Sequence, residues 1–118
     1  HIMFGPGQAD VKYAAYELLD GIAEAMHNYD YYLMIEGHTD SIPINTAQFP
    51  SNWELSSARA SAVVRYMINK GIDPLRLSGI GHGANYPIAD NSSPEGRESN
   101  RRVEFIFTQT PFRARFEE

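Results

Sequence analysis

The chain has 118 residues, of which 42% are hydrophobic and 21% charged, enough for one two-layer domain and too few for two. The net charge of -5 argues against a general nucleic-acid-binding protein, because such proteins need an excess of Lys and Arg. The chain has no cysteine, which excludes thiol catalysis, disulfides and zinc-thiolate sites.

The first third of the chain predicts a strand end, a helix and a buried strand. We expect residues 1–3 to be a cloning remnant, residues 4–8 to end a strand in a turn, and Asp10 to cap a helix that runs to about His27. The run from Tyr31 to Glu36 is β-prone and predicts a buried strand. The predicted apolar stripe of the helix consists of Val11, Ala15, Leu18, Ile22 and Met26.

The middle of the chain predicts a loop and a second, well-capped helix. Residues 41–50 contain two prolines and no apolar period, which is typical of a loop. Ser51 and Glu54 form a capping box that begins the helix, and Gly71 ends it. The predicted core stripe of this helix consists of Ala60, Val63, Val64, Met67 and Ile68.

The last third predicts two strands separated by a polar loop. Residues 76–80 read as a short strand, residues 86–97 as a loop with one helical turn over residues 95–100, and residues 102–108 as an alternating strand. The order β-α-β-α-β-(α)-β predicts an α+β two-layer sandwich with its helices on one face of a mixed sheet. We expect a single domain over residues 4–110 and a C-terminal tail over residues 111–118.

Asp40 and Arg59 are the main candidates for a binding site. Asp40 follows a predicted strand end, and Arg59 lies early in the second helix, where free N–H groups attract carboxylates. We expect this anion and cation to lie on opposite sides of a solvent-open pocket that suits a zwitterion, with backbone N–H groups near Leu55 helping to hold its carboxylate. A structural ion pair between them is the alternative. In such an open site, Arg59→Ala is expected to abolish binding while changing stability by no more than about 1 kcal/mol.

Other constellations have simpler interpretations. His38, Asp40 and His82 suggest a metal site as a minor alternative, but no further ligand at a defined spacing is found, so hydrogen-bonded structural histidines are favoured and no metal or cofactor is expected. Neither the nucleophile motif G-x-S-x-G nor the metalloprotease motif H-E-x-x-H is present. Glu36 with Asp40 is the only candidate pair of catalytic carboxylates. No enzymatic activity is therefore expected. Phe49 and Trp53 are interpreted as stapling the loop to the helix, with stacking on a sugar ring as the alternative. Arg101 and Arg102 are adjacent and are therefore expected to face opposite sides.

Three motifs resemble the OmpA-like C-terminal domain: G-H-T-D from Gly37, N-W-E-L-S-S-A-R-A from Asn52 and E-G-R-E-S-N-R-R-V-E from Glu95. The resemblance runs from about Phe4 to Phe107. It implies a β-α-β-α-β-β domain that binds peptidoglycan without cleaving it. By the same resemblance, Asp40 and Arg59 would grip the diaminopimelate of the stem peptide, and the supporting positions are Thr39, Asn52, Leu55 through its backbone, and Arg101.

The long loop with I-P-I and F-P-S-N-W-E-L-S further resembles the B subunit of the flagellar motor stator (the MotB or PomB type). This resemblance implies a homodimer in the periplasm, anchored in the inner membrane by an N-terminal helix absent from this chain and partnered by the stator A subunit. A wall anchor of a type VI secretion system and a general outer-membrane tether are alternatives within the same fold, and a wall hydrolase or amidase is an alternative from another class.

Overall fold

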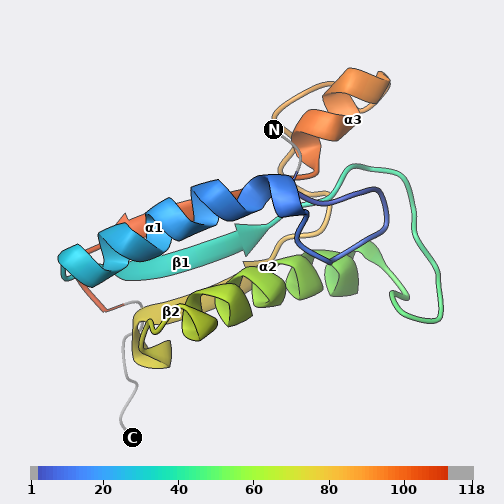
Figure 1. The fold of residues 1–118 in the computed structure, drawn as a ribbon. Coiled ribbons are helices and arrows are strands. Elements are labelled where there is room, and N and C mark those ends of the chain that lie inside the picture. Colours follow the sequence, from blue (N-terminus) through green and yellow to red (C-terminus); the bar gives the residue numbers. More distant parts are fainter. Residues whose placement is uncertain (1–2, 112–118) are drawn as a thin grey trace, which may run out of the picture.

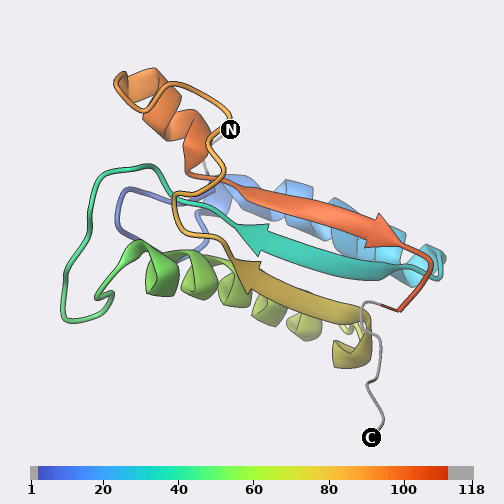
Figure 2. The same ribbon diagram turned by 180° about the vertical axis from the view of Figure 1, so that it is seen from behind.

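Helices α1 and α2 lie on one face of a three-stranded sheet in the computed structural model, which describes residues 3–111 (Figures 1 and 2). The sheet order is β2-β1-β3, with β1 parallel to β2 and antiparallel to β3. The predicted α+β sandwich with a mixed sheet is confirmed. In chain order the elements are a 3-10 turn (Tyr13–Ala15), α1 (Tyr16–Asn28), β1 (Tyr32–Gly37), α2 (Asn52–Asn69), a 3-10 turn (Pro74–Arg76), β2 (Leu77–Gly81), α3 (Pro94–Asn100) and β3 (Val103–Thr108).

The predicted strand end at residues 4–8 is wrong, because this segment forms a turn. Pro6 has no N–H to give to a strand ladder, and Gly7 adopts a positive φ of 67°, which favours glycine. The turn is closed by a bond from Lys12 N to Met3 O of 2.9 Å. Met3, assigned by sequence to the remnant, is buried in the core beside Phe4. Residues 1–2 of the expected remnant and residues 112–118 of the expected tail lie outside the described residues.

Helix α1 is present, but its predicted start and buried stripe are partly wrong. Asp10 does not cap it, since the 3-10 turn begins after Lys12 and no side chain caps that turn. The tighter winding of a 3-10 turn changes the phase of the residues that follow it, so Leu19 is buried whereas Leu18 is 47% exposed. The buried apolar residues of this segment are Ala15, Leu19, Ala23 and Met26.

Helix α2 begins as predicted. The Ser51 hydroxyl accepts a bond from Trp53 N of 3.2 Å and donates to the Glu54 carboxylate. The bond from Ser51 holds the pKa of Glu54 below its ordinary value. Most of the predicted stripe packs on the sheet, although Ile68 is exposed, and Gly71 ends the helix with φ 89°.

Two glycines bring the start of α2 against the ends of β1 and β2. A Cβ added to Gly37 would lie 2.1 Å from Ser56 O, and one added to Gly81 would lie 2.4 Å from Ser57 N. Only glycine permits this approach of helix to sheet. The first turns of α2 therefore lie beside the C-terminal ends of the two parallel strands, where the candidate site is found.

The other face of the sheet carries no helix within the described part of the chain (Figure 2). Leu33 and Ile35 of β1 point to the helices and are fully buried, so Met34 and Glu36 point to the open face. Ile80 and Ile106 are partly exposed on this face. No helix among residues 3–111 is long and apolar enough to cross a membrane.

Candidate functional site

A pocket of about 160 Å³ opens beyond the C-terminal end of β1. Its walls come from four separate segments: the N-terminal turn, the chain after β1, the start of α2, and the residue that follows α3. All six residues predicted from the sequence line it, and they are Thr39, Asp40, Asn52, Leu55, Arg59 and Arg101. Residues that the sequence analysis did not assign to it are Pro6, Gly7, Ile42, Pro43 and Ile44.

Asp40 is held in the pocket wall by two fixed contacts. One carboxylate oxygen accepts a bond of 3.0 Å from the N–H of Ile42, and the other forms an ion pair of 2.8 Å with Arg101. The side chains of Asp40 and Arg101 are only 11% and 13% exposed. The structure therefore brings Asp40 and Arg59 to one pocket without an ion pair between them, and the cation that contacts Asp40 is Arg101.

Arg59 is fully buried, so the expectation of an exposed arginine is wrong. Its Nε donates to Gln8 O at 2.8 Å, Nη2 to Gly5 O at 2.9 Å and Nη1 to His38 O at 3.2 Å. The guanidinium also lies 5.3 Å from the centre of the Phe4 ring. Burial lowers the pKa of Arg59 to about 10, which leaves it charged at neutral pH, and the carboxylate of Asp40 opposes that lowering. Arg59 thus ties the N-terminal turn to the end of β1.

The supporting residues fix the loop after β1. Thr39 donates through its hydroxyl to Asp40 O at 2.9 Å, and Asn52 donates to Ile42 O at 3.1 Å. Leu55 is 3% exposed, and its N–H donates to Ser51 O at 3.2 Å, as the first turn of a helix requires. Leu55 therefore contributes an apolar wall, and its N–H is engaged inside the helix.

Asn100 is a buried residue that holds two loops together, and it was not predicted from the sequence. Its side chain accepts bonds from Ile88 N (2.7 Å) and Ala89 N (3.0 Å) and donates to Ala89 O (3.1 Å) and Asn91 Oδ1 (2.8 Å). Asn91 Oδ1 also accepts a bond from Ser41 N of 3.2 Å. This network joins the loop before α3 to the loop after β1. The only sequence signal for it was the position of Asn100 inside the third motif.

The two aromatic residues near the pocket have different surroundings. Phe49 is 5% exposed, and two bonds of 2.9 Å join its backbone to Thr46 within the same loop. Trp53 is 56% exposed and lines a second, shallower hollow together with Asn52 and Asn85. Trp53 is thus available to a ligand next to the main pocket.

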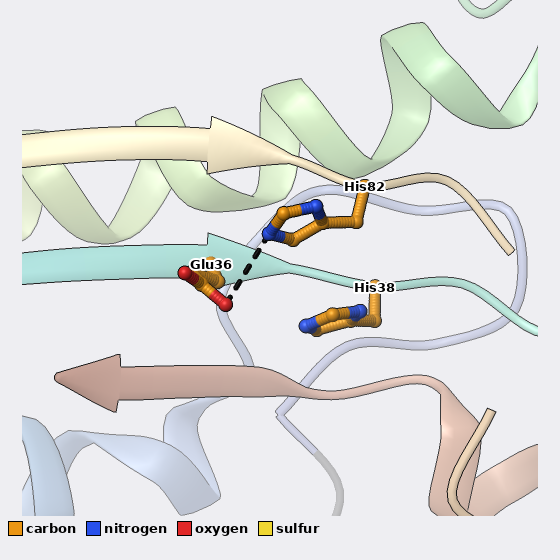
Figure 3. Close-up of side chains that lie close together, drawn as sticks. All are labelled: Glu36, His38 and His82. Atoms are coloured by element: carbon orange, nitrogen blue, oxygen red, sulfur yellow. Dashed lines mark ion pairs between the residues drawn. The ribbon is translucent and has the colours of Figure 1, made fainter. Parts of the chain in front are cut away.

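A second polar cluster lies on the open face of the sheet and is formed by Glu36, His38 and His82 (Figure 3). Arg102 and Glu104 line the same hollow, so Arg101 and Arg102 do face different sites. Asp40 faces the first pocket instead. It therefore does not belong to a metal site with the two histidines, and it does not form a carboxylate pair with Glu36. Burial, followed by the charge of Arg102, lowers the pKa of His38. The expectation that His38 is hydrogen-bonded is wrong, because neither ring nitrogen has a hydrogen-bond partner.

Comparison with known proteins finds a matching family and several similar proteins. The sequence model of the OmpA family matches residues 3–101. Similar curated proteins include the uncharacterized protein YtxE of Bacillus subtilis (39% identity, 92% of this chain and 46% of the relative), Motility protein B of the same organism (36%, 89% and 41%) and the peptidoglycan-binding protein ArfA of Mycobacterium tuberculosis (37%, 89% and 31%). The chain spans less than half the length of these relatives.

Solved structures agree with the fold. The C-terminal domain of Helicobacter pylori MotB superimposes with a TM-score of 0.84 at 28% identity, over 91% of this chain and 83% of that one. A putative MotB-like protein from Desulfovibrio vulgaris gives 0.81 at 33% identity, over 92% and 68%. The cell wall anchor of the type VI secretion system of Pseudomonas aeruginosa gives 0.78 at 38% identity, over 87% and 72%.

Proposed function

Since this chain belongs to the OmpA family, as its motifs predicted, we propose that it is a non-catalytic module that binds peptidoglycan and anchors a longer protein to the cell wall. The observation that carries the proposal is the single pocket in which Asp40, Arg101 and Arg59 meet. Two similar proteins are named for related properties, the peptidoglycan-binding protein ArfA and the cell wall anchor of a secretion system.

The pocket suits the zwitterionic end of a stem peptide such as diaminopimelate. An ammonium group would meet Asp40, whose carboxylate has acceptor capacity beyond its bonds to Ile42 and Arg101. The ligand carboxylate would meet Arg101, in the field of the buried charge of Arg59. Ile42 and Leu55 offer apolar walls to the methylene chain. With charge-assisted bonds worth roughly 1.5–3 kcal/mol each when shielded, the affinity of one site is expected on the order of 10 µM to mM.

Binding without cleavage fits the groups in the pocket. Among the described residues that line it, there is no histidine, and the Thr39 hydroxyl donates to a backbone carbonyl. A nucleophile needs an adjacent base to become reactive, and no such pair is present in this lining. Asp40 is engaged with Arg101 and would hold a ligand ammonium.

We place the parent protein in the periplasm as the B subunit of a flagellar motor stator, a homodimer held in the inner membrane and partnered by the A subunit. The similarity to Motility protein B and to MotB structures supports this assignment. The 38% identity to the type VI anchor supports the second candidate, a secretion-system anchor. Replacing the corresponding domain of B. subtilis Motility protein B with this chain and measuring swimming separates them, because only the stator assignment expects motility to be restored.

Asp40→Asn tests the pocket directly. The asparagine keeps an oxygen for the Ile42 N–H but removes the charge that holds an ammonium. We expect at least about a tenfold loss of co-sedimentation with purified peptidoglycan, consistent with about 1.4 kcal/mol or more of lost binding energy. Free diaminopimelate should compete with peptidoglycan for the unsubstituted chain but should not reduce the residual binding of the Asp40→Asn protein.

Asp30→Asn is the matched control, since Asp30 is exposed in the turn between α1 and β1 and loses the same charge away from the pocket. The Asp30→Asn protein should co-sediment with peptidoglycan as well as the unsubstituted chain does. If the Asp40→Asn protein also pellets like the unsubstituted chain while remaining folded by circular dichroism, the pocket is not the peptidoglycan site.

A further inference from the structure

We propose that the open face of the sheet carries a binding site for a divalent transition-metal ion of the zinc type, formed by Glu36, His38 and His82 with Glu104 beside them. This site lies apart from the pocket proposed for peptidoglycan. Its three central residues come from the ends of the parallel strands, Glu36 within β1 and the two histidines directly after β1 and β2.

The donor atoms already lie close together (Figure 3). One ligand atom from each of Glu36, His38 and His82 falls within 4.8 Å of the other two. His82 Nε2 and Glu36 Oε1 are 3.2 Å apart. This is about the spacing of neighbouring ligand atoms around a tetrahedral ion with bonds of about 2.0–2.1 Å. The His38 donor lies within 4.8 Å of the other two, and side-chain torsions have to bring it closer and turn a ring so that both nitrogens meet one ion.

The unsatisfied state of His38 is an independent indication of a missing partner. Its side chain is only 3% exposed, yet both ring nitrogens lack a hydrogen bond. Leaving a buried polar group unpaired costs about 1–3 kcal/mol, so such groups in folded proteins call for an explanation. A metal ion would give one of these nitrogens the partner that the protein does not supply.

The geometry of His82 fits the same explanation. Its Nε2 is 3.2 Å from a Glu36 oxygen and buried, but the contact does not satisfy hydrogen-bond geometry. In a metal site the lone pairs of neighbouring ligands converge on the ion and do not point at each other. The two imidazoles are stacked with ring centres 5.0 Å apart, and Tyr86 packs edge-on against both. The three rings line the same hollow.

The charges around the cluster favour a cation. Glu36 and Glu104 are cross-strand neighbours that bring two carboxylates to the site, and Arg102 neutralises part of that charge through its ion pair with Glu104. Glu104 lies 3.9 Å from His38 Nε2 and is placed to act as a fourth ligand or to orient that ring.

The donor set selects the class of metal. Two imidazole nitrogens with one or two carboxylates suit Zn²⁺ and its neighbours Co²⁺, Ni²⁺ and Cu²⁺, whereas Mg²⁺ and Ca²⁺ prefer oxygen ligands alone. We therefore expect the site to take Zn²⁺ and to leave Mg²⁺ unbound at the same concentration.

Zinc titration by calorimetry, combined with thermal unfolding, tests the site. The protein for this test carries His1→Ala, because the imidazole of His1 can itself bind a metal. We expect binding of one Zn²⁺ per chain with a Kd in the micromolar range or below, and a rise in Tm with zinc that Mg²⁺ does not produce. X-ray absorption of the zinc complex should show two histidine nitrogens in the coordination shell.

Ligand variants decide whether the bound ion occupies this cluster. His82→Ala and Glu36→Gln should each weaken zinc binding at least about tenfold. The matched controls His27→Ala and Glu98→Gln alter exposed residues away from the cluster and should leave the Kd unchanged. His38 is left intact because its burial makes a substitution there prone to unfold the chain.

Two outcomes would overturn the proposal. One is the absence of stoichiometric zinc binding in the His1→Ala protein, which would mean that the cluster is a stacked histidine pair with no metal. The other is zinc binding that survives both His82→Ala and Glu36→Gln, which would place the ion elsewhere. Neither result bears on peptidoglycan binding, since Asp40 and Arg59 are not part of the cluster.

Discussion

Arg59 carries its charge in the interior, where it serves the architecture of the pocket. Three carbonyl groups, from Gly5, Gln8 and His38, accept its N–H groups. The planar, pre-organised guanidinium can reach acceptors on different segments at once, which a lysine cannot do. Loss of binding in an Arg59 variant would therefore not by itself identify a ligand contact, because the walls of the pocket depend on this residue.

We expect Arg59→Ala to lower the free energy of unfolding by at least about 3 kcal/mol, because it leaves buried carbonyl groups without donors. Arg59→Lys should restore only part of this loss. Urea denaturation measures both, and Arg65→Ala is the control, since Arg65 is an exposed arginine of the same helix and its loss should cost no more than about 0.5 kcal/mol. Equal stability of the Arg59→Ala and Arg65→Ala proteins would contradict this role.

The elements themselves were predicted well where local chemistry determines them. The capping box of Ser51 and Glu54 identified the start of α2, and the β-prone run after Tyr31 identified β1. The turn within residues 4–8 was predicted, but the strand end was not found, because the conformation of this segment depends on tertiary contacts with Arg59, some fifty positions away. The motifs identified the residues of the pocket, but they did not indicate that Arg59 is buried or that Arg101 is the cation paired with Asp40. Such pairings depend on the packing of distant segments.

The close approach of α2 to β1 provides a test at the level of elements. Gly37→Ala places a methyl group against the backbone of Ser56, so α2 must shift, and we expect a loss of roughly 1–3 kcal/mol of stability together with weaker peptidoglycan binding. Gly21→Ala in α1 makes the same chemical change where nothing lies within 4 Å, and it should stabilise the protein by about 0.5–1 kcal/mol. Denaturation curves that move in the same direction for the two variants would contradict the packing argument.

The whole molecule places its two candidate sites on different surfaces. The pocket proposed for peptidoglycan lies among the loops beyond β1 and the start of α2, whereas the histidine cluster lies on the face of the sheet that the helices leave uncovered. A ligand at one site therefore leaves the other accessible. A single pocket of modest affinity cannot hold a load for long, so an anchor built from this domain depends on several copies bound to the wall together.

Joining two copies of the chain through a dimeric coiled coil should raise its apparent affinity for peptidoglycan sacculi by about 10²-fold or more, because the second site binds at a high effective concentration. Retention of the fusion on sacculi during serial dilution measures this gain. The same fusion with Asp40→Asn in both copies should gain nothing. A fusion that washes off as fast as the single chain would show that the sites cannot engage the wall together.

The bonds between Arg59 and the N-terminal turn also define a mechanical route through the domain. Gly5 and Gln8 lie near the start of the chain, and their carbonyls attach to an arginine that itself lines the pocket. Tension on the N-terminal turn would thus reach the wall of the pocket through a handful of hydrogen bonds, as well as through Met3 and Phe4 in the hydrophobic core. Pulling on this turn would therefore act on the walls of the proposed pocket, so a load on the chain would change the pocket's hold on a bound ligand.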